Sequence, residues 1–131
     1  MKTLTLQTNG RTHFVDITAQ VAAAAQELGI DQGILTIFVP HTTAGVTINE
    51  NADPDVTADM ELVLDRMVPW SGGYAHGEGN TAAHVKASMM GSSAHVIVAD
   101  GKLQLGIWQA IYFCEFDGPR TRTAWISATC G

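Results

Sequence analysis

The central run of the chain is Gly33-Ile34-Leu35-Thr36-Ile37-Phe38-Val39, with Pro40 and His41 directly after it. A continuous apolar run that is rich in β-branched residues predicts a buried β-strand. Pro40 has no backbone N–H for a strand ladder, so we expect the strand to stop there. His41 is therefore predicted to lie at or just past a strand end, outside the apolar core.

Upstream of this run, alternating polar and apolar residues lie on both sides of Asn9-Gly10. This pattern predicts two strands, over about residues 2–8 and 11–17, that pair as a hairpin. Thr18 can then cap a helix over about residues 18–28, and Gly29 is well placed to end it.

Downstream of the run, residues 45–48 indicate a short second strand. Asp53 is an N-cap acceptor and Pro54 suits the first helical position, so a helix is predicted to begin here and to end before Pro69. Its apolar residues recur at helical spacing and predict one buried face. They are Val56, Met60, Val63, Leu64 and Met67.

Residues 69–80 contain four glycines and little apolar material, which is typical of a long and often functional loop. Asn80 or Thr81 can cap a short helix that Gly91 ends. The rest of the chain is predicted to be β-rich: a strand over about 94–99, one long strand or two over 103–116, and a last strand over 120–128. We therefore expect one domain over residues 1–131, of the α+β class, with a mixed or antiparallel, sandwich-like β core and two or three helices packed against it.

Composition excludes some functions. The chain of 131 residues has a net charge of −6 and no basic stripe, which argues against nucleic-acid and anionic membrane partners. A small anionic substrate is still allowed, because one site needs only a few cations or a metal. The two cysteines form no Cys-x-x-Cys pair, and a reduced, cytoplasmic setting fits best.

Three histidines lie outside the apolar stripes: His41, His76 and His84. Three imidazoles with one open position are the pattern of a catalytic zinc site. Their spacing is not that of a helical zinc motif, so separate hydrogen-bonding roles are the alternative.

Acids, cations and loop residues nearby also have two interpretations. Glu50 could bind metal or act as a general base, whereas Asp53 is explained by its capping role alone. Lys86, Arg120 and Arg122 could contact phosphate or could be solvated charges. Ser92-Ser93 could bind an anion, and the Trp108 face could stack on a ring-shaped ligand.

Several segments taken together resemble the YjbQ family, also called the secondary thiamine-phosphate synthase family, from about Thr3 to Ser127. The segments are His41-Thr42-Thr43-Ala44-Gly45, Asn49-Glu50-Asn51-Ala52-Asp53-Pro54-Asp55-Val56, Glu78-Gly79-Asn80, Ala83-His84-Val85-Lys86-Ala87-Ser88, Gly91-Ser92-Ser93, Gly106-Ile107-Trp108-Gln109 and Cys114-Glu115-Phe116-Asp117-Gly118-Pro119-Arg120. The chain departs from the family's Gly-Thr-Trp-Gln-Gly at Ile107 and Ala110, which bears on ligand fit more than on fold.

The resemblance implies a homotrimer with a polar site at or near the subunit interface. The activity it implies is weak: hydroxymethylpyrimidine diphosphate and thiazole phosphate would be joined, with release of pyrophosphate. We expect catalytic roles for Glu50, Asp53, His84 and Lys86, and metal ligation by His41, His76 and His84, with zinc favoured and magnesium as the alternative. Substrate or phosphate contacts are expected from Asn49, Asn80, Ser92, Ser93, Trp108, Gln109 and Arg120. A metal-dependent hydrolase or lyase and a non-catalytic trimeric module that binds a metabolite or metal are the alternatives.

Overall fold

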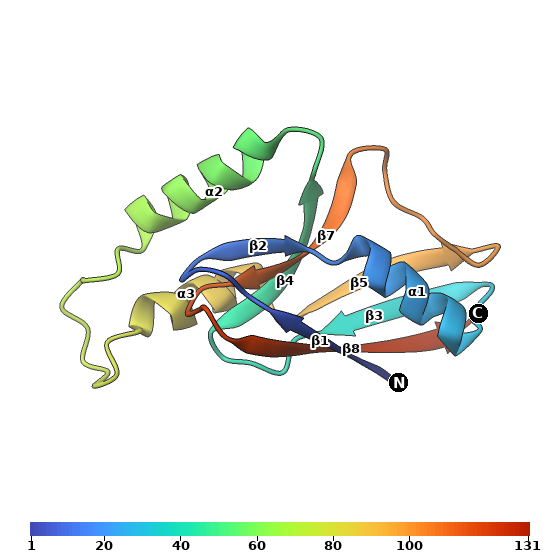
Figure 1. The fold of residues 1–131 in the computed structure, drawn as a ribbon, viewed down its shortest axis with the longest axis horizontal. Helices are drawn as coiled ribbons and strands as arrows, with labels where there is room; N and C mark the ends of the chain where they lie inside the picture. Colours follow the sequence, from blue (N-terminus) through green and yellow to red (C-terminus); the bar gives the residue numbers. More distant parts are fainter.

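The computed structural model describes all 131 residues, and its eleven elements form two antiparallel sheets and three helices (Figure 1). The strands are β1 (Lys2–Gln7), β2 (His13–Asp16), β3 (Gly33–Phe38), β4 (Ala44–Glu50), β5 (Ser93–Ala99), β6 (Lys102–Leu103), β7 (Gln109–Glu115) and β8 (Thr121–Cys130). The helices are α1 (Thr18–Leu28), α2 (Pro54–Met67) and α3 (Thr81–Met90). The α+β prediction is confirmed. No helix is long and apolar enough to cross a membrane.

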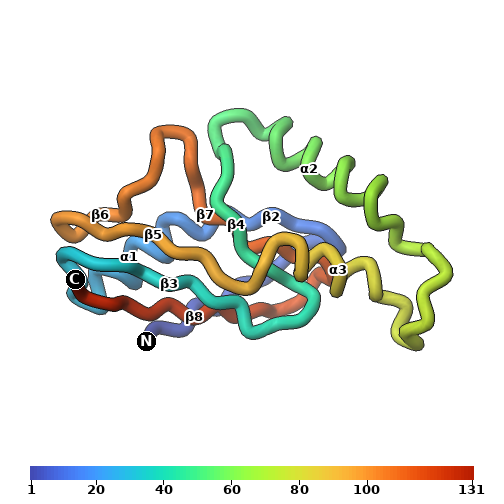
Figure 2. Tube along the Cα trace, turned by 180° about the vertical axis from the view of Figure 1, so that it is seen from behind, coloured from blue at the N-terminus to red at the C-terminus, as the bar shows by residue number.

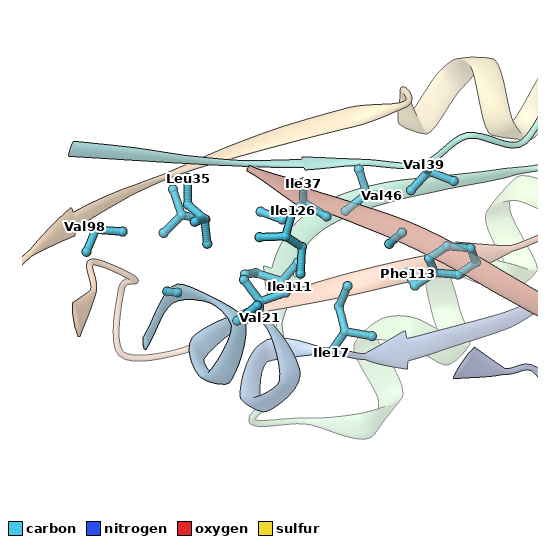
Figure 3. Packing of buried hydrophobic residues seen from close by; sticks show 14 of the residues in the cluster. Ile17, Val21, Leu35, Ile37, Val39, Val46, Val98, Ile111, Phe113 and Ile126 are labelled. Carbon is cyan, nitrogen blue, oxygen red and sulfur yellow. The ribbon is translucent and has the colours of Figure 1, made fainter. Parts of the chain in front are cut away.

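Five strands form one sheet in the order β1-β8-β3-β5-β6, and three form the other in the order β2-β7-β4. The main core combines buried residues of α1 and of both sheets. In Figure 3, Val21 of α1 points toward Ile111 of β7 and Ile126 of β8. A second, smaller cluster lies on the other face of β7, where Tyr112 and Cys114 meet Ala83 and Ala87 of α3 and Leu64 of α2. Each face of the three-stranded sheet is therefore covered.

The expected hairpin at Asn9-Gly10 is wrong, because β1 pairs with β8 and β2 pairs with β7 in the other sheet. Thr8 explains the difference. Its hydroxyl is fully buried and donates to Oε1 of Glu115 at 2.8 Å, while its backbone N–H donates to the carbonyl of Arg120 at 2.9 Å. These contacts hold the chain beside β8 where a hairpin would have turned it back. For residues 103–116, where one long strand or two were expected, the structure has two: β6 ends at Leu103, β7 follows, and they belong to different sheets.

Helix α2 begins as predicted, with Oδ1 of Asp53 accepting the N–H of Asp55 at 2.9 Å. Its predicted apolar face, however, is largely unburied. Only Leu64 joins a core cluster, whereas Val63 is 49% exposed and Met67 is 62% exposed. Figures 1 and 2 show α2 standing away from both sheets, unlike α1 and α3. Within one chain, therefore, two helices pack against the sheets and the third is barely covered.

Candidate functional site

His41 takes the place of a strand carbonyl. In the β3–β8 ladder Phe38 lies opposite Trp125, so Pro40 would lie opposite Thr123 if β3 continued. β3 has already ended, and Thr123 would be left with an unpaired N–H. Nε2 of His41 accepts that N–H at 3.0 Å. A backbone N–H can only donate, so Nε2 carries no proton and the proton of the neutral ring is on Nδ1.

The surroundings of His41 also favour its neutral form. Burial lowers the pKa of His41, and the positive charge of Arg122 lowers it further, against a smaller opposing effect from the charge of Glu115. The imidazole edge packs against the ring of Phe113, with ring centroids 6.4 Å apart. At neutral pH, His41 is therefore a fixed ring with a single N–H donor on Nδ1.

Next to His41, Glu115 and Arg122 form a buried ion pair; their side chains are 0% and 2% exposed. Nε of Arg122 donates to Oε1 of Glu115 at 2.8 Å, and Nη2 donates to Oε2. Nη2 also donates to the hydroxyl of Thr43 at 2.8 Å. Burial raises the pKa of Glu115, but the hydrogen bonds from Arg122, Asp117 N–H and Thr8 together lower it below its ordinary value. Glu115 is therefore ionised and neutralises the guanidinium.

Two cavities adjoin at this point. One has a volume of about 490 Å³ and is bounded by α3 and the start of β4. The other has a volume of about 540 Å³ and is bounded by residues 38–43 together with Arg120 and Arg122. His41, Thr42 and Ser92 line both cavities. The two hollows thus share a polar wall.

Helix α3 supplies the far wall of the smaller cavity through His84, Ala87 and Ser88. Their spacing of three and four residues places them on one helix face. Gly45 allows α3 to approach β4 closely, because a Cβ there would lie 2.6 Å from the carbonyl oxygen of Gly91. The ring of His76 packs edge-on against that of His84, with centroids 5.4 Å apart.

The three expected metal ligands do not assemble within one chain. No group of three His, Cys, Asp or Glu side chains is close enough to hold a metal ion. His84 lies beside His76 and shares a cavity with His41, but Nε2 of His41 is already occupied by the N–H of Thr123. The chain thus offers at most a pair of imidazoles, His76 and His84, whereas zinc sites use three or four ligands.

Lys86 and Asn80 serve structural contacts. Lys86 lies two residues from His84, on another face of α3, and its buried ammonium forms an ion pair with Asp65 of α2. Nδ2 of Asn80 donates to Oδ2 of Asp117 at 2.8 Å. Neither residue lines the two cavities. Ser93 does not line them either, because it is the first residue of β5 and pairs with Phe38.

A second group of expected site residues lies at the opposite end of β4, about 20 Å from its start in an extended strand of this length. Glu50 pairs with Gln109 across the β4–β7 ladder, and its carbonyl accepts the hydroxyl of Tyr112 at 3.0 Å. Asn49, Asp53 and Trp108 lie at the same end. The single polar site expected from the sequence is therefore two separate groups in one chain: the His41 cavities and the Glu50 end.

Sequence reasoning did not predict the roles of Glu115, Thr43 and Ser88, and it left Arg122 as a possible solvated charge. A signal was present for the ion pair. Glu115 is the only charged residue of β7, which is buried from Ala110 onward, and Arg122 alternates with the core residues Ala124 and Ile126 of β8. A charge that shares the inward face of a strand indicates a buried partner.

Comparison with known proteins gives a consistent result. The family model described as UPF0047 protein YjbQ-like matches residues 2–130. The chain is 58% identical over 127 residues to the UPF0047 protein YugU of Bacillus subtilis, covering 96% of each chain, and 48% identical over 121 residues to a UPF0047 protein of Methanocaldococcus jannaschii, covering 92% of this chain and 88% of that one. A crystal structure of an uncharacterized conserved protein of the YjbQ/UPF0047 family from Clostridium acetobutylicum has a TM-score of 0.96 at 51% identity, over 98% of this chain and all of that one.

Proposed function

Because the chain belongs to the YjbQ (UPF0047) family, we propose that it is a small-metabolite enzyme with weak thiamine-phosphate synthase activity. It would join hydroxymethylpyrimidine diphosphate to thiazole phosphate. The pair of adjoining cavities that share the wall of His41, Thr42 and Ser92 is the observation that carries this proposal. A reaction that joins two small molecules needs two neighbouring subsites, and it gains most of its rate from holding them in contact.

The chemistry would begin with loss of pyrophosphate from the exocyclic carbon of the pyrimidine. The carbon–oxygen bond breaks with its electron pair leaving on pyrophosphate, and the thiazole nitrogen then forms the new carbon–nitrogen bond. Hydrogen-bond donors at the leaving oxygen lower this barrier. Arg120, Arg122, Ser92 and His41 line the larger cavity and are the candidate donors. His84 and Ser88 of the smaller cavity would position the second substrate.

The proposal includes a homotrimer with the site near the subunit interface. The exposed apolar side chains of α2, Val63 and Met67, support burial against another copy, because a helix of fourteen residues gains most of its stability from packing. In such an assembly the Glu50 end of one copy could lie next to the cavities of another copy. Glu50 and Asp53 keep their proposed catalytic roles only in that arrangement.

A divalent metal is part of the proposal only at His76 and His84. Two imidazoles leave a zinc ion short of ligands, so further ligands would have to come from a second copy, and the Glu50 end is the candidate source of oxygen ligands for zinc or magnesium. A metal-dependent hydrolase remains the alternative that the adjacent His76 and His84 rings favour.

The deciding experiment incubates the purified protein with both thiamine precursors and measures thiamine phosphate and pyrophosphate together. The two products should form in equal amounts, and His84→Ala should lower their rate while the surface variant His95→Ala leaves it unchanged. Pyrophosphate or phosphate release without thiamine phosphate would favour the hydrolase. Absence of any product in a correctly assembled protein would refute the enzyme and favour the non-catalytic module.

A further inference from the structure

We propose that His41 and Arg122 form a phosphoryl-binding subsite in the larger cavity, in which His41 acts through its Nδ1–H as a hydrogen-bond donor and not as a metal ligand. The inference rests on the proposed function, because it names the subsite that would hold the phosphate or diphosphate of a substrate. It assigns to His41 a role opposite to the metal ligation that its sequence context suggests.

The tautomer of His41 leaves its one N–H group, on Nδ1, free of protein partners. Thr123 N–H occupies Nε2 at 3.0 Å, and the hydroxyl of Thr123 lies 3.3 Å from the same atom. Nδ1 has no protein partner, while the residue lines both cavities. The Nδ1–H group is therefore available to donate a hydrogen bond to a bound ligand. A metal on Nε2 would instead leave the Thr123 N–H unpaired at the edge of the sheet.

Arg122 also has N–H groups that no protein atom accepts. Its Nε and Nη2 are fully used by Glu115 and Thr43, whereas Nη1 makes no hydrogen bond to the protein. The side chain is 2% exposed, yet it lines the larger cavity. The Glu115 carboxylate fixes the plane of the guanidinium, so the remaining N–H groups have a set direction. Guanidinium groups held in this way recognise phosphate oxygens well.

The shape and charge of the cavity favour a phosphoryl group. His41 and Thr42, Ser92, and Arg122 come from three different segments and line one space of about 540 Å³. Donors from several directions suit a tetrahedral anion with three free oxygens better than a planar carboxylate. Arg120 stands at the rim, half exposed, and binds Asp117 through Nη2 at 3.2 Å. Each guanidinium is thus already balanced by a carboxylate, and the specificity of the subsite depends on directed N–H groups more than on net positive charge.

Two substitutions at position 41 separate the ring nitrogens. In His41→Gln the amide reaches the Nε2 position and can still bind the Thr123 N–H, but the donor at Nδ1 is lost. In His41→Asn the shorter amide places a donor near Nδ1. Calorimetric titration with inorganic phosphate and with pyrophosphate should show about tenfold weaker binding for His41→Gln, the size expected for one hydrogen bond to a charged acceptor. His41→Asn should lose less, and the surface variant His95→Gln should match the unmodified protein.

Nitrogen-15 histidine spectra of the unmodified protein provide a readout that does not depend on any variant. They should show Nδ1 protonated and Nε2 unprotonated for His41, with the Nδ1 signal moving when pyrophosphate is added. A proton on Nε2, or equal phosphate and pyrophosphate affinity in folded His41→Gln and unmodified protein, would overturn the subsite. An acetate titration that matches pyrophosphate in affinity and in its dependence on His41 would overturn the phosphoryl assignment.

Failure of the subsite and failure of the proposed function give different results. Pyrophosphate binding that depends on His41, in a protein that never joins the thiamine precursors, would support the subsite and refute the synthase. Joining of the precursors with pyrophosphate affinity unchanged in His41→Gln would support the synthase and refute the subsite.

Discussion

Glu115 and Arg122 are seven residues apart in sequence and lie on consecutive strands, β7 and β8, which belong to different sheets. Their side chains nevertheless meet in a fully buried ion pair. The pair therefore connects the two sheets at the cavity end of the molecule. The Thr8 hydroxyl donates to its carboxylate, and the Thr43 hydroxyl accepts from Nη2 of its guanidinium. The same residues that join the sheets thus orient the guanidinium toward the cavity.

Removal of one partner of this pair should be strongly destabilising. We expect Arg122→Met to lower the free energy of unfolding by about 3–5 kcal/mol, because Glu115 would be left buried and uncompensated. The double variant Glu115→Gln/Arg122→Met should recover a large part of that loss. Urea unfolding of the single and double variants measures both values. A loss in the double variant that equals the sum of the losses in Arg122→Met and in Glu115→Gln would show that the pair is not energetically coupled.

The pair should also make stability depend on pH. The pKa of Glu115 is lower in the folded protein than its ordinary value of 4.5, so its contribution to stability is complete above that value and is lost as pH falls through the folded pKa. The protein should therefore lose stability on acidification below about pH 4.5, and the double variant should lose less. Thermal unfolding at pH 3 to 7 in steps measures this. A pH profile identical in the two proteins would exclude Glu115 as the source.

The lowered pKa of His41 should cause a second change in stability, at higher pH. Its folded pKa is lowered from 6.5, so between the folded pKa and 6.5 the unfolded chain binds the proton more readily. Stability should rise with pH through this interval. His41→Gln has no group that titrates there and should show a flatter curve. His95→Gln is the control, and it should retain the slope of the unmodified protein.

The sequence predicts elements well where a local signal decides them. The structure confirms the element ends predicted at Gly29, Pro40, Asp53-Pro54 and Gly91, because each of these signals acts on the backbone within a few residues. Asn9-Gly10 fails as a hairpin signal because Thr8 binds Glu115 and Arg120 more than a hundred residues away. No local pattern contains a contact of that kind.

The candidate site shows the same limit. His41 and His84 were predicted as site residues from their positions outside the apolar stripes, and both line the smaller cavity. Whether a histidine nitrogen accepts or donates depends on its neighbour across the sheet, here Thr123, and the sequence does not give that register. The separation of Glu50 from His41 follows from their places at opposite ends of β4, which the sequence indicated only as a short strand.

The exposed apolar face of α2 should be the contact surface of the proposed trimer. Met67→Glu should reduce the proposed trimer to smaller species, because a carboxylate would enter an apolar contact. Ala58→Glu is a matched control: it adds the same group to the opposite, exposed face of the helix and should leave the trimer intact. Light scattering coupled to gel filtration measures the mass of each. A monomeric unmodified protein, or equal behaviour of the two variants, would contradict a role for this face.

Metal content should depend on His84 and not on His41. In the structure the ring of His84 is beside that of His76, while Nε2 of His41 is held by Thr123. After zinc loading and desalting, elemental analysis should show zinc lost from His84→Ala and from His76→Ala, and retained in His41→Gln. Zinc lost equally from His41→Gln would require the imidazole of His41 to leave the Thr123 N–H, and it would restore the three-histidine site in place of the phosphoryl subsite.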